Sequence, residues 1–164
     1  MSEDTERQAR LTQVAAIAVA LETKTGCPAQ MMIAQWAVES GWGSKPVGRC
    51  NYFGIKANSR DPESCVVETE EVVNGKVVEE NAAFADYDSL DASCEDYAVL
   101  ITQGQPYSEA WASYRETGDL NALIVAVAAK YASDPRYSEL VTLIAHQSNV
   151  VKAINQERVA PQGA

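Results

Sequence analysis

One carboxylate stands at the end of an apolar helical stretch early in the chain. Glu39 lies in the segment Ala34–Gly43, where Trp36 and Val38 precede it and a Gly-Trp-Gly break follows it. A glutamate packed against such side chains loses hydration, and helix-end carbonyls add negative potential, so both effects raise the pKa of the carboxyl group. A raised pKa suits a general acid near neutral pH, the group that glycoside cleavage requires. An ordinary exposed glutamate beside a helix cap fits this segment equally well.

A second set of carboxylates lies on a predicted β-hairpin. The runs 66–73 and 76–80 are rich in valine and glutamate, and they flank Asn74-Gly75, which favours a type I′ turn. Alternation along a strand then places Glu71 on one face and Glu70 on the other. The turn sets this expected register: Val73 opposite Lys76, Glu71 opposite Val78, and Thr69 opposite Glu80. An acidic, solvated hairpin is the plain alternative.

Four segments together resemble a known family. They are Ala37–Gly43 (A-x-E-S-G-W-G), Asn51–Lys56 (N-x-F-G-I-K), Thr69–Glu71 (T-x-E) and Tyr131–Pro135 (Y-A-[TS]-D-P). Each motif alone is unspecific, but all four occur in the order of the family pattern. Over roughly residues 10 to 145, the chain resembles glycoside hydrolase family 73. Its members are bacterial endo-β-N-acetylglucosaminidases of flagellar, autolysin and phage origin that cut peptidoglycan.

The resemblance implies three catalytic residues. Glu39 would be the general acid, and Tyr131 would border the cleft, where its phenol could bind the acetamido group or position water. A core aromatic is the alternative for Tyr131. Counted back from the Asn-Gly turn, Glu71 falls on the glutamate of the T-x-E motif and Glu70 on its variable position. The acidic neighbours leave the choice between these two carboxylates open.

Further residues are expected to line the substrate cleft. Gln35 lies one helical turn before Glu39, so the two side chains point the same way. Trp42 either stacks on a sugar ring or covers the helix end. The 51–56 motif is expected to shape the cleft floor, and Lys56 could meet a carbonyl or carboxylate of the glycan peptide or remain solvated. The expected substrate-binding residues are Gln35, Trp42, Asn51, Phe53, Lys56 and Tyr137, although packing is the simpler role for the last.

The resemblance implies hydrolysis of the β-1,4 bond on the reducing side of N-acetylglucosamine in peptidoglycan. Glu71 would activate water or stabilise the developing cation, or the substrate N-acetyl group would attack in its place. The alternatives are a lytic transglycosylase and a non-catalytic wall-binding or structural partner of a secretion or phage apparatus. An amidase lacks machinery here, because His146 is the single histidine. We expect no metal and no organic cofactor.

Composition limits the class of partner. The chain has 164 residues, 46% of them hydrophobic, and a formal net charge of −10, which together indicate one globular domain. We expect a catalytic domain at residues 1–157 and a flexible tail at 158–164, acting as a monomer. The acidic charge argues against nucleic acid and against anionic membranes as partners.

The first residues do not resemble an export signal. Met1–Arg7 is polar and acidic, and the apolar run Val14–Leu21 is too short to span a bilayer. We therefore expect synthesis in the cytoplasm without a visible signal peptide, although a leader that has been removed would explain the absence equally well. Action on the bacterial cell wall would then follow release or non-classical export.

The four cysteines allow two interpretations. Cys50 and Cys65 flank a loop that a disulfide could close. We favour free thiols at all four positions, as in a protein made in a reducing compartment.

The expected fold is α+β and mostly helical, with a lysozyme-like helical lobe and a small β-hairpin lobe bordering the cleft. An irregular segment is expected at 44–64. Helices are predicted at 5–24, 28–39, from 89, at 107–116, at 119–132, and from 135 onward through His146 as one final helix.

Overall fold

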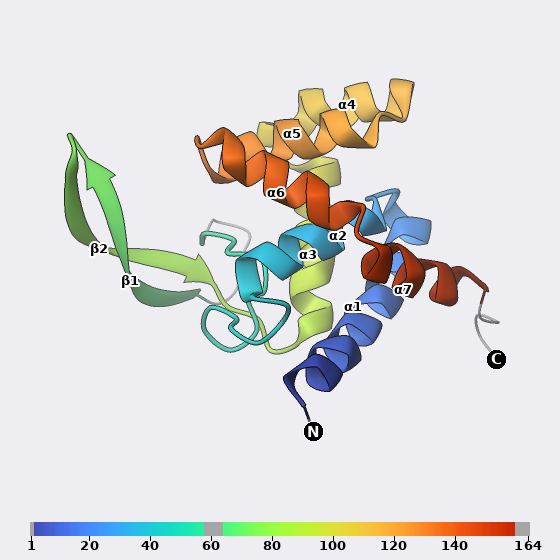
Figure 1. The fold of residues 1–164 in the computed structure, drawn as a ribbon. Helices are drawn as coiled ribbons and strands as arrows, with labels where there is room; N and C mark the ends of the chain where they lie inside the picture. Colours follow the sequence, from blue (N-terminus) through green and yellow to red (C-terminus); the bar gives the residue numbers. More distant parts are fainter. Residues whose placement is uncertain (1, 58–63, 160–164) are drawn as a thin grey trace.

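The computed structural model describes residues 2–57 and 64–159, without the side chains of residues 67–73 and 78–81. Helices dominate this part of the chain and one two-stranded antiparallel sheet accompanies them, which confirms the expected fold class (Figure 1). The elements are α1 (Glu3–Thr25), α2 (Ala29–Ser40), β1 (Ser64–Val73), β2 (Lys76–Ala85), α3 (Leu90–Gln103), the 3-10 turn η1 (Gln105–Tyr107), α4 (Ser108–Thr117), α5 (Leu120–Tyr131), α6 (Pro135–Ala145) and α7 (Ser148–Val159).

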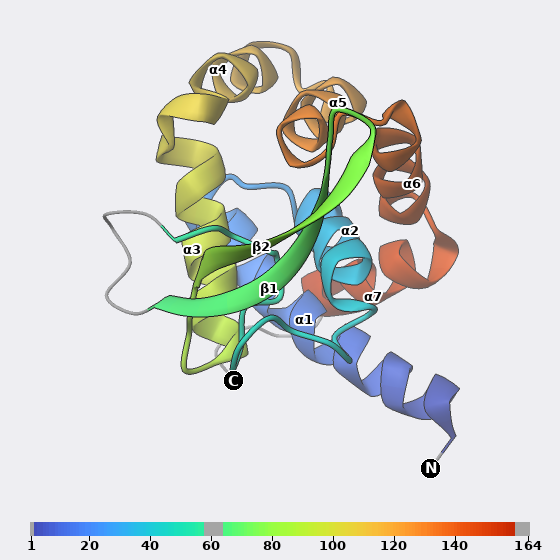
Figure 2. The same cartoon turned by 90° about the vertical axis from the view of Figure 1, so that its left-hand side faces the viewer.

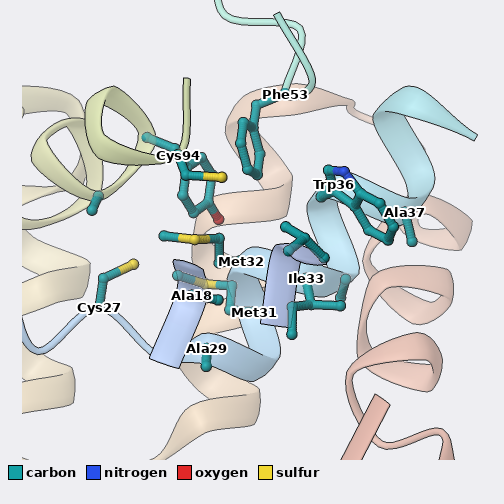
Figure 3. Packing of buried hydrophobic residues seen from close by; sticks show 14 of the residues in the cluster. Ala18, Cys27, Ala29, Met31, Met32, Ile33, Trp36, Ala37, Phe53 and Cys94 are labelled. Atoms are coloured by element: carbon teal, nitrogen blue, oxygen red, sulfur yellow. The ribbon is translucent and has the colours of Figure 1, made fainter. Parts of the chain in front are cut away.

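Helix α2 is the centre of the hydrophobic core. It contacts α1, α3, α6 and α7, so nearly its whole circumference is buried. Met31, Met32 and Ile33 are fully buried, and Trp36 is 1% exposed (Figure 3). A helix covered on all sides must be apolar on all sides, as this one is. The packing fixes the position of its last turn, which carries Glu39.

The end of α2 turns sharply through left-handed backbone. Trp42 has φ 57° between two glycines that also have positive φ. The Arg10 side chain donates a hydrogen bond to the Trp42 carbonyl (2.8 Å), and the Trp42 ring packs edge-on against Trp36. The Arg7 guanidinium lies 5.4 Å from the centre of the Trp42 ring, in cation–π contact. Trp42 therefore packs over the helix end, and its other expected role, stacking on a sugar ring, stays a prediction.

The hairpin has the predicted register. Val73 pairs with Lys76, Glu71 with Val78 and Thr69 with Glu80. Both strands extend beyond the predicted bounds, most of all β2, which continues to Ala85. The reason is a further pairing that local sequence does not reveal: the backbone of residues 55–57 bonds to Ala83 (2.9 Å) and Ala85 (3.0 Å). Figures 1 and 2 show the hairpin projecting from the helices and crossing in front of α2 and α3.

The predicted final helix is in fact two helices, so that prediction was wrong. Helix α6 ends before His146, and α7 begins at Ser148. The side chain of Asn149 accepts a hydrogen bond from the backbone of Val150 (3.0 Å) at this new start. Serine and asparagine compete with helical bonding in this way, and so favour helix starts over helix interiors. The break lets α7 pack against α1.

The boundary of the expected tail also needs correction. Arg158 lies within α7 and forms an ion pair with Glu22 of α1 (2.5 Å). Residues 160–164, the rest of the expected tail, lie outside the described residues.

All four cysteines are free thiols, as we favoured. Cys27 and Cys94 lie in the core, and burial raises the pKa of Cys94 to about 12. Among the described residues, no helix combines the length and the apolar character needed to cross a bilayer.

Candidate active site

Glu39 lies in the last turn of α2 and is partly buried. Its Oε1 atom accepts a hydrogen bond from the Tyr137 hydroxyl (2.5 Å) on α6. Burial raises the pKa of the Glu39 carboxyl group, and the Tyr137 hydrogen bond opposes that rise without cancelling it. The helix end thus carries a carboxyl group whose proton is held more tightly than usual.

The second carboxylate oxygen faces the loop that contains Gly54. A Cβ atom at Gly54 would lie 3.1 Å from Oε2 of Glu39, and the backbone there has φ +63°. Glycine meets both demands, because it has no Cβ and tolerates positive φ. Gly54 also lines a cavity of about 300 Å³ together with Lys56, Lys130 and Tyr131. Oε2 of Glu39 therefore lies against a residue that lines this cavity.

Tyr131 lies beside this carboxyl group. Its ring stacks on that of Tyr137, with centroids 6.2 Å apart. Burial is the main cause that raises the pKa of the Tyr131 hydroxyl, and the nearby Glu39 carboxyl group adds to the rise. The phenol consequently stays protonated. Its buried hydroxyl has no hydrogen-bond partner among the described residues. Because Tyr131 lines the cavity, this hydroxyl is a candidate donor to a molecule that binds there.

Gln35 lies in the protein interior behind the site. It is fully buried, and its Oε1 atom accepts a hydrogen bond from Tyr97 on α3. Its amide nitrogen approaches the Tyr137 phenol closely enough to lower the pKa there, but makes no hydrogen bond of regular geometry. The Tyr97 ring in turn stacks on Phe53, 4.4 Å between centroids. Buried contacts therefore run from the 51–56 loop through Tyr97 and Gln35 toward Tyr137.

The side chain of Asn51 holds the 51–56 loop in place through hydrogen bonds. Its side-chain nitrogen donates to the carbonyls of Ile55 (2.9 Å) and Ala85 (2.8 Å), and its oxygen accepts from the backbone nitrogens of Phe53 and Ile55 (3.2 Å each). Asn51 is 1% exposed and Phe53 is fully buried. Both residues, like Gln35, thus hold the floor of the site in place and do not present their polar or aromatic groups at its surface.

The structure brings together Glu39, Tyr131, Tyr137 and the loop with Lys56, whose side chain is exposed and lines the cavity. Glu71 is placed only by its backbone, on β1 beside the turn. The side chains of Glu70 and Glu71 lie outside the described residues, so the choice between them stays a prediction. Tyr97 was missed as a member of the site, because on the sequence it is one core aromatic in the apolar stripe of α3.

Comparison with known proteins gives a consistent result. Residues 15–150 match the glucosaminidase family model, described as mannosyl-glycoprotein endo-beta-N-acetylglucosaminidase. A probable N-acetylmuramidase of Lactococcus lactis subsp. lactis is 32% identical over 153 residues, which cover 88% of this chain and 34% of that protein. The peptidoglycan hydrolase FlgJ of Pseudomonas aeruginosa is 33% identical over 147 residues, covering 85% of this chain and 36% of that protein. The chain thus spans about a third of the length of these relatives.

Solved structures share the fold. The catalytic domain of the autolysin Auto from Listeria monocytogenes aligns with a TM-score of 0.74 and 26% identity, covering 96% of this chain and 89% of that one. A peptidoglycan hydrolase from Sphingomonas sp. A1 aligns with a TM-score of 0.70 and 26% identity, covering 95% and 98%. The chain therefore belongs to the glucosaminidase family, glycoside hydrolase family 73.

Proposed function

We propose that this chain hydrolyses the β-1,4 bond on the reducing side of N-acetylglucosamine in peptidoglycan. The observation that carries the proposal is the Glu39 carboxyl group: Tyr137 holds one oxygen, the other lies against Gly54, which lines the cavity, and the pKa is raised. The family match supports the same substrate class, as do the peptidoglycan hydrolases of Pseudomonas aeruginosa and Sphingomonas sp. A1 that the chain resembles. The partner is a glycan strand of the cell wall, cut by a single copy of the chain.

Glu39 would act as the general acid. Because Oε1 accepts the Tyr137 hydrogen bond, the transferable proton resides on Oε2, the oxygen beside Gly54. Transfer of that proton to the glycosidic oxygen lets the leaving sugar depart as positive charge develops on the other ring. The unpartnered Tyr131 hydroxyl would bind the acetamido group or the attacking water.

The second half of the reaction needs a group that supports the developing cation. Glu71, on the hairpin strand β1, is our candidate to activate water or stabilise this charge. Attack by the substrate's own N-acetyl group would leave Glu71 with an electrostatic role. Neither route needs a metal or an organic cofactor.

The products of digested sacculi test this proposal. We expect new reducing ends at N-acetylglucosamine, detected after borohydride reduction by mass spectrometry, with ¹⁸O incorporated from labelled water. New reducing ends at N-acetylmuramic acid would instead show a muramidase. Anhydromuramyl ends that contain no ¹⁸O would show a lytic transglycosylase. Persistent wall binding with no loss of turbidity would show a non-catalytic module.

Substitution Tyr137→Phe is expected to shift the pH profile. Loss of the hydroxyl leaves burial unopposed, so the pKa of Glu39 rises further. A general acid acts in its protonated form, and its activity is lost as pH rises through this pKa. The alkaline limb of kcat/KM should therefore move to higher pH, while the maximal rate falls because the carboxyl group is less well held.

The matched control for this measurement is Tyr52→Phe, which removes a hydroxyl that forms no hydrogen bond with Glu39 within the described residues and does not affect its pKa. Its profile should coincide with that of the unmodified protein. An unmoved alkaline limb in Tyr137→Phe would contradict the assignment of Glu39 as the titrating acid.

A further inference from the structure

A second groove lies along the antiparallel helices α4 and α5, which pack side by side (Figure 1). It has a volume of about 710 Å³ and is lined by polar and apolar side chains of both helices and η1. Ser113 lies in its α4 wall, while Asp119 and Lys130 stand at opposite ends of its α5 wall. The catalytic step proposed above uses none of these groups.

This groove adjoins the cavity at Gly54, the residue that lies against the Glu39 carboxyl group. Lys130 lines both volumes, and the neighbouring residues Pro106 and Tyr107 of η1 line one each. Gly54, at the other side of the smaller cavity, contacts the Glu39 carboxyl group. A substrate cut at Glu39 can therefore extend past Lys130 into the groove.

The length of the groove fits a short peptide. Eleven residue steps of α5 separate Asp119 from Lys130, and a helix rises about 1.5 Å per residue, which gives about 16 Å. An extended chain covers about 3.3–3.6 Å per residue, so this distance accommodates about five residues. Peptidoglycan carries a peptide stem of about this length on each muramic acid.

The charges in the groove also suit such a stem. Lys130 lines both volumes and Lys56 lines the smaller cavity with it, and neither lysine forms an ion pair within the described residues. Two cations at one cavity are unusual in a chain of net charge −10, and they match a carboxylate near the sugar end of the peptide. Glu109 and Asp119 line the groove beyond, where they match the amino group of a diamino acid.

We propose that the groove between α4 and α5 binds the peptide stem of the strand being cut, so that the enzyme prefers stem-bearing glycan to bare glycan. This inference rests on the proposed function. Its test uses purified glycan strands with intact stems and the same strands stripped of stems by an amidase. The unmodified protein should cut both, the stem-bearing strand with the lower KM.

Two variants probe the groove. Ser113→Trp fills its middle, and Lys130→Glu reverses the charge at its entrance; both residues are exposed, so the fold is retained. Lys130→Glu should lower kcat/KM on stem-bearing strands about tenfold or more, the effect of losing one charge-assisted contact, and Ser113→Trp should lower it at least as much because the ring occupies the groove. Cleavage of bare strands by Ser113→Trp should stay within about twofold of the original rate, a difference of under 0.5 kcal/mol.

Ala112→Trp adds the same ring one position along α4, outside the groove lining, and serves as the control. This variant should leave kcat/KM unchanged on both the stem-bearing and the bare strands. If Ser113→Trp lowered kcat/KM equally on both strands, the groove would bind sugar and the inference would be overturned. Unchanged kcat/KM on both strands would overturn it as well. If the unmodified protein cut neither strand, the proposed function itself would fail.

Discussion

Glu39→Gln is expected to remove nearly all cleavage of purified sacculi, by on the order of 10²–10⁴-fold in rate. Glutamine has the shape of glutamate and can still accept the Tyr137 hydrogen bond, which is 2.5 Å long in the structure. It has no acidic proton to place on the leaving oxygen. The loss should appear as a slower clearing of turbidity and a slower release of reducing sugar.

The same variant should be at least as stable as the original protein at neutral pH. Burial makes the folded-state pKa of Glu39 higher than its unfolded value, so the ionised carboxylate present at high pH costs stability. Below the unfolded pKa both states are protonated and this cost vanishes. Thermal unfolding should therefore show a Tm for Glu39→Gln that equals or exceeds the original near neutral pH. A fall in Tm that accompanies the loss of activity would show a structural defect.

The hairpin carboxylates provide a matched comparison. Glu71→Gln should lose less activity than Glu39→Gln, and Glu70→Gln should lose little. The two residues occupy successive positions of β1, and successive positions of a β-strand belong to opposite faces. If Glu70→Gln lowered activity more than Glu71→Gln, Glu70 and not Glu71 would be the second catalytic carboxylate.

Asn51→Ala is expected to give the largest loss of stability, about 3 kcal/mol or more in the free energy of unfolding. The change removes a side chain that bonds four backbone groups in the protein interior. Each buried polar group left without a partner costs about 1–3 kcal/mol, and part of this is recovered where water enters. Urea unfolding measures the difference, and activity should fall with it because the loop holds Gly54 against Glu39.

Asn155→Ala on α7 is the control, because Asn155 is exposed and alanine favours helix. It should leave stability unchanged or slightly raised. A loss below about 1 kcal/mol in Asn51→Ala would mean that the four hydrogen bonds are not the anchor of the loop.

Local patterns predicted the hairpin and the position of Glu39 well. Asn74-Gly75 determines the turn, and the two-residue period of a strand then determines every pair, so the observed register is the predicted one. Glu39 lies at the end of an apolar helix that glycine terminates, and the structure places it there, partly buried. Both features depend on residues close together in the chain.

Features that depend on distant residues were not predicted. The extension of β2 to Ala85 needs the backbone near Ile55, and the role of Gln35 needs Tyr97, sixty-two positions away. Tyr137 was assigned to substrate or packing, whereas its hydroxyl bonds the carboxyl group of Glu39. No periodicity within one element carries such information, since each contact forms only when separate elements pack together.

The attachment of the hairpin has a mechanical consequence. Its base is joined to the body through Ile55–Ala57, and Glu71 pairs with Val78, seven residues along β2 from Ala85. At about 3.3 Å per residue this makes a lever arm of about 23 Å. A tilt of about ten degrees at the pivot moves the Glu71 backbone by about 4 Å, roughly the width between neighbouring strands. Small adjustments at the pivot would thus change the distance between the backbone of Glu71, our candidate for the second carboxylate, and Glu39.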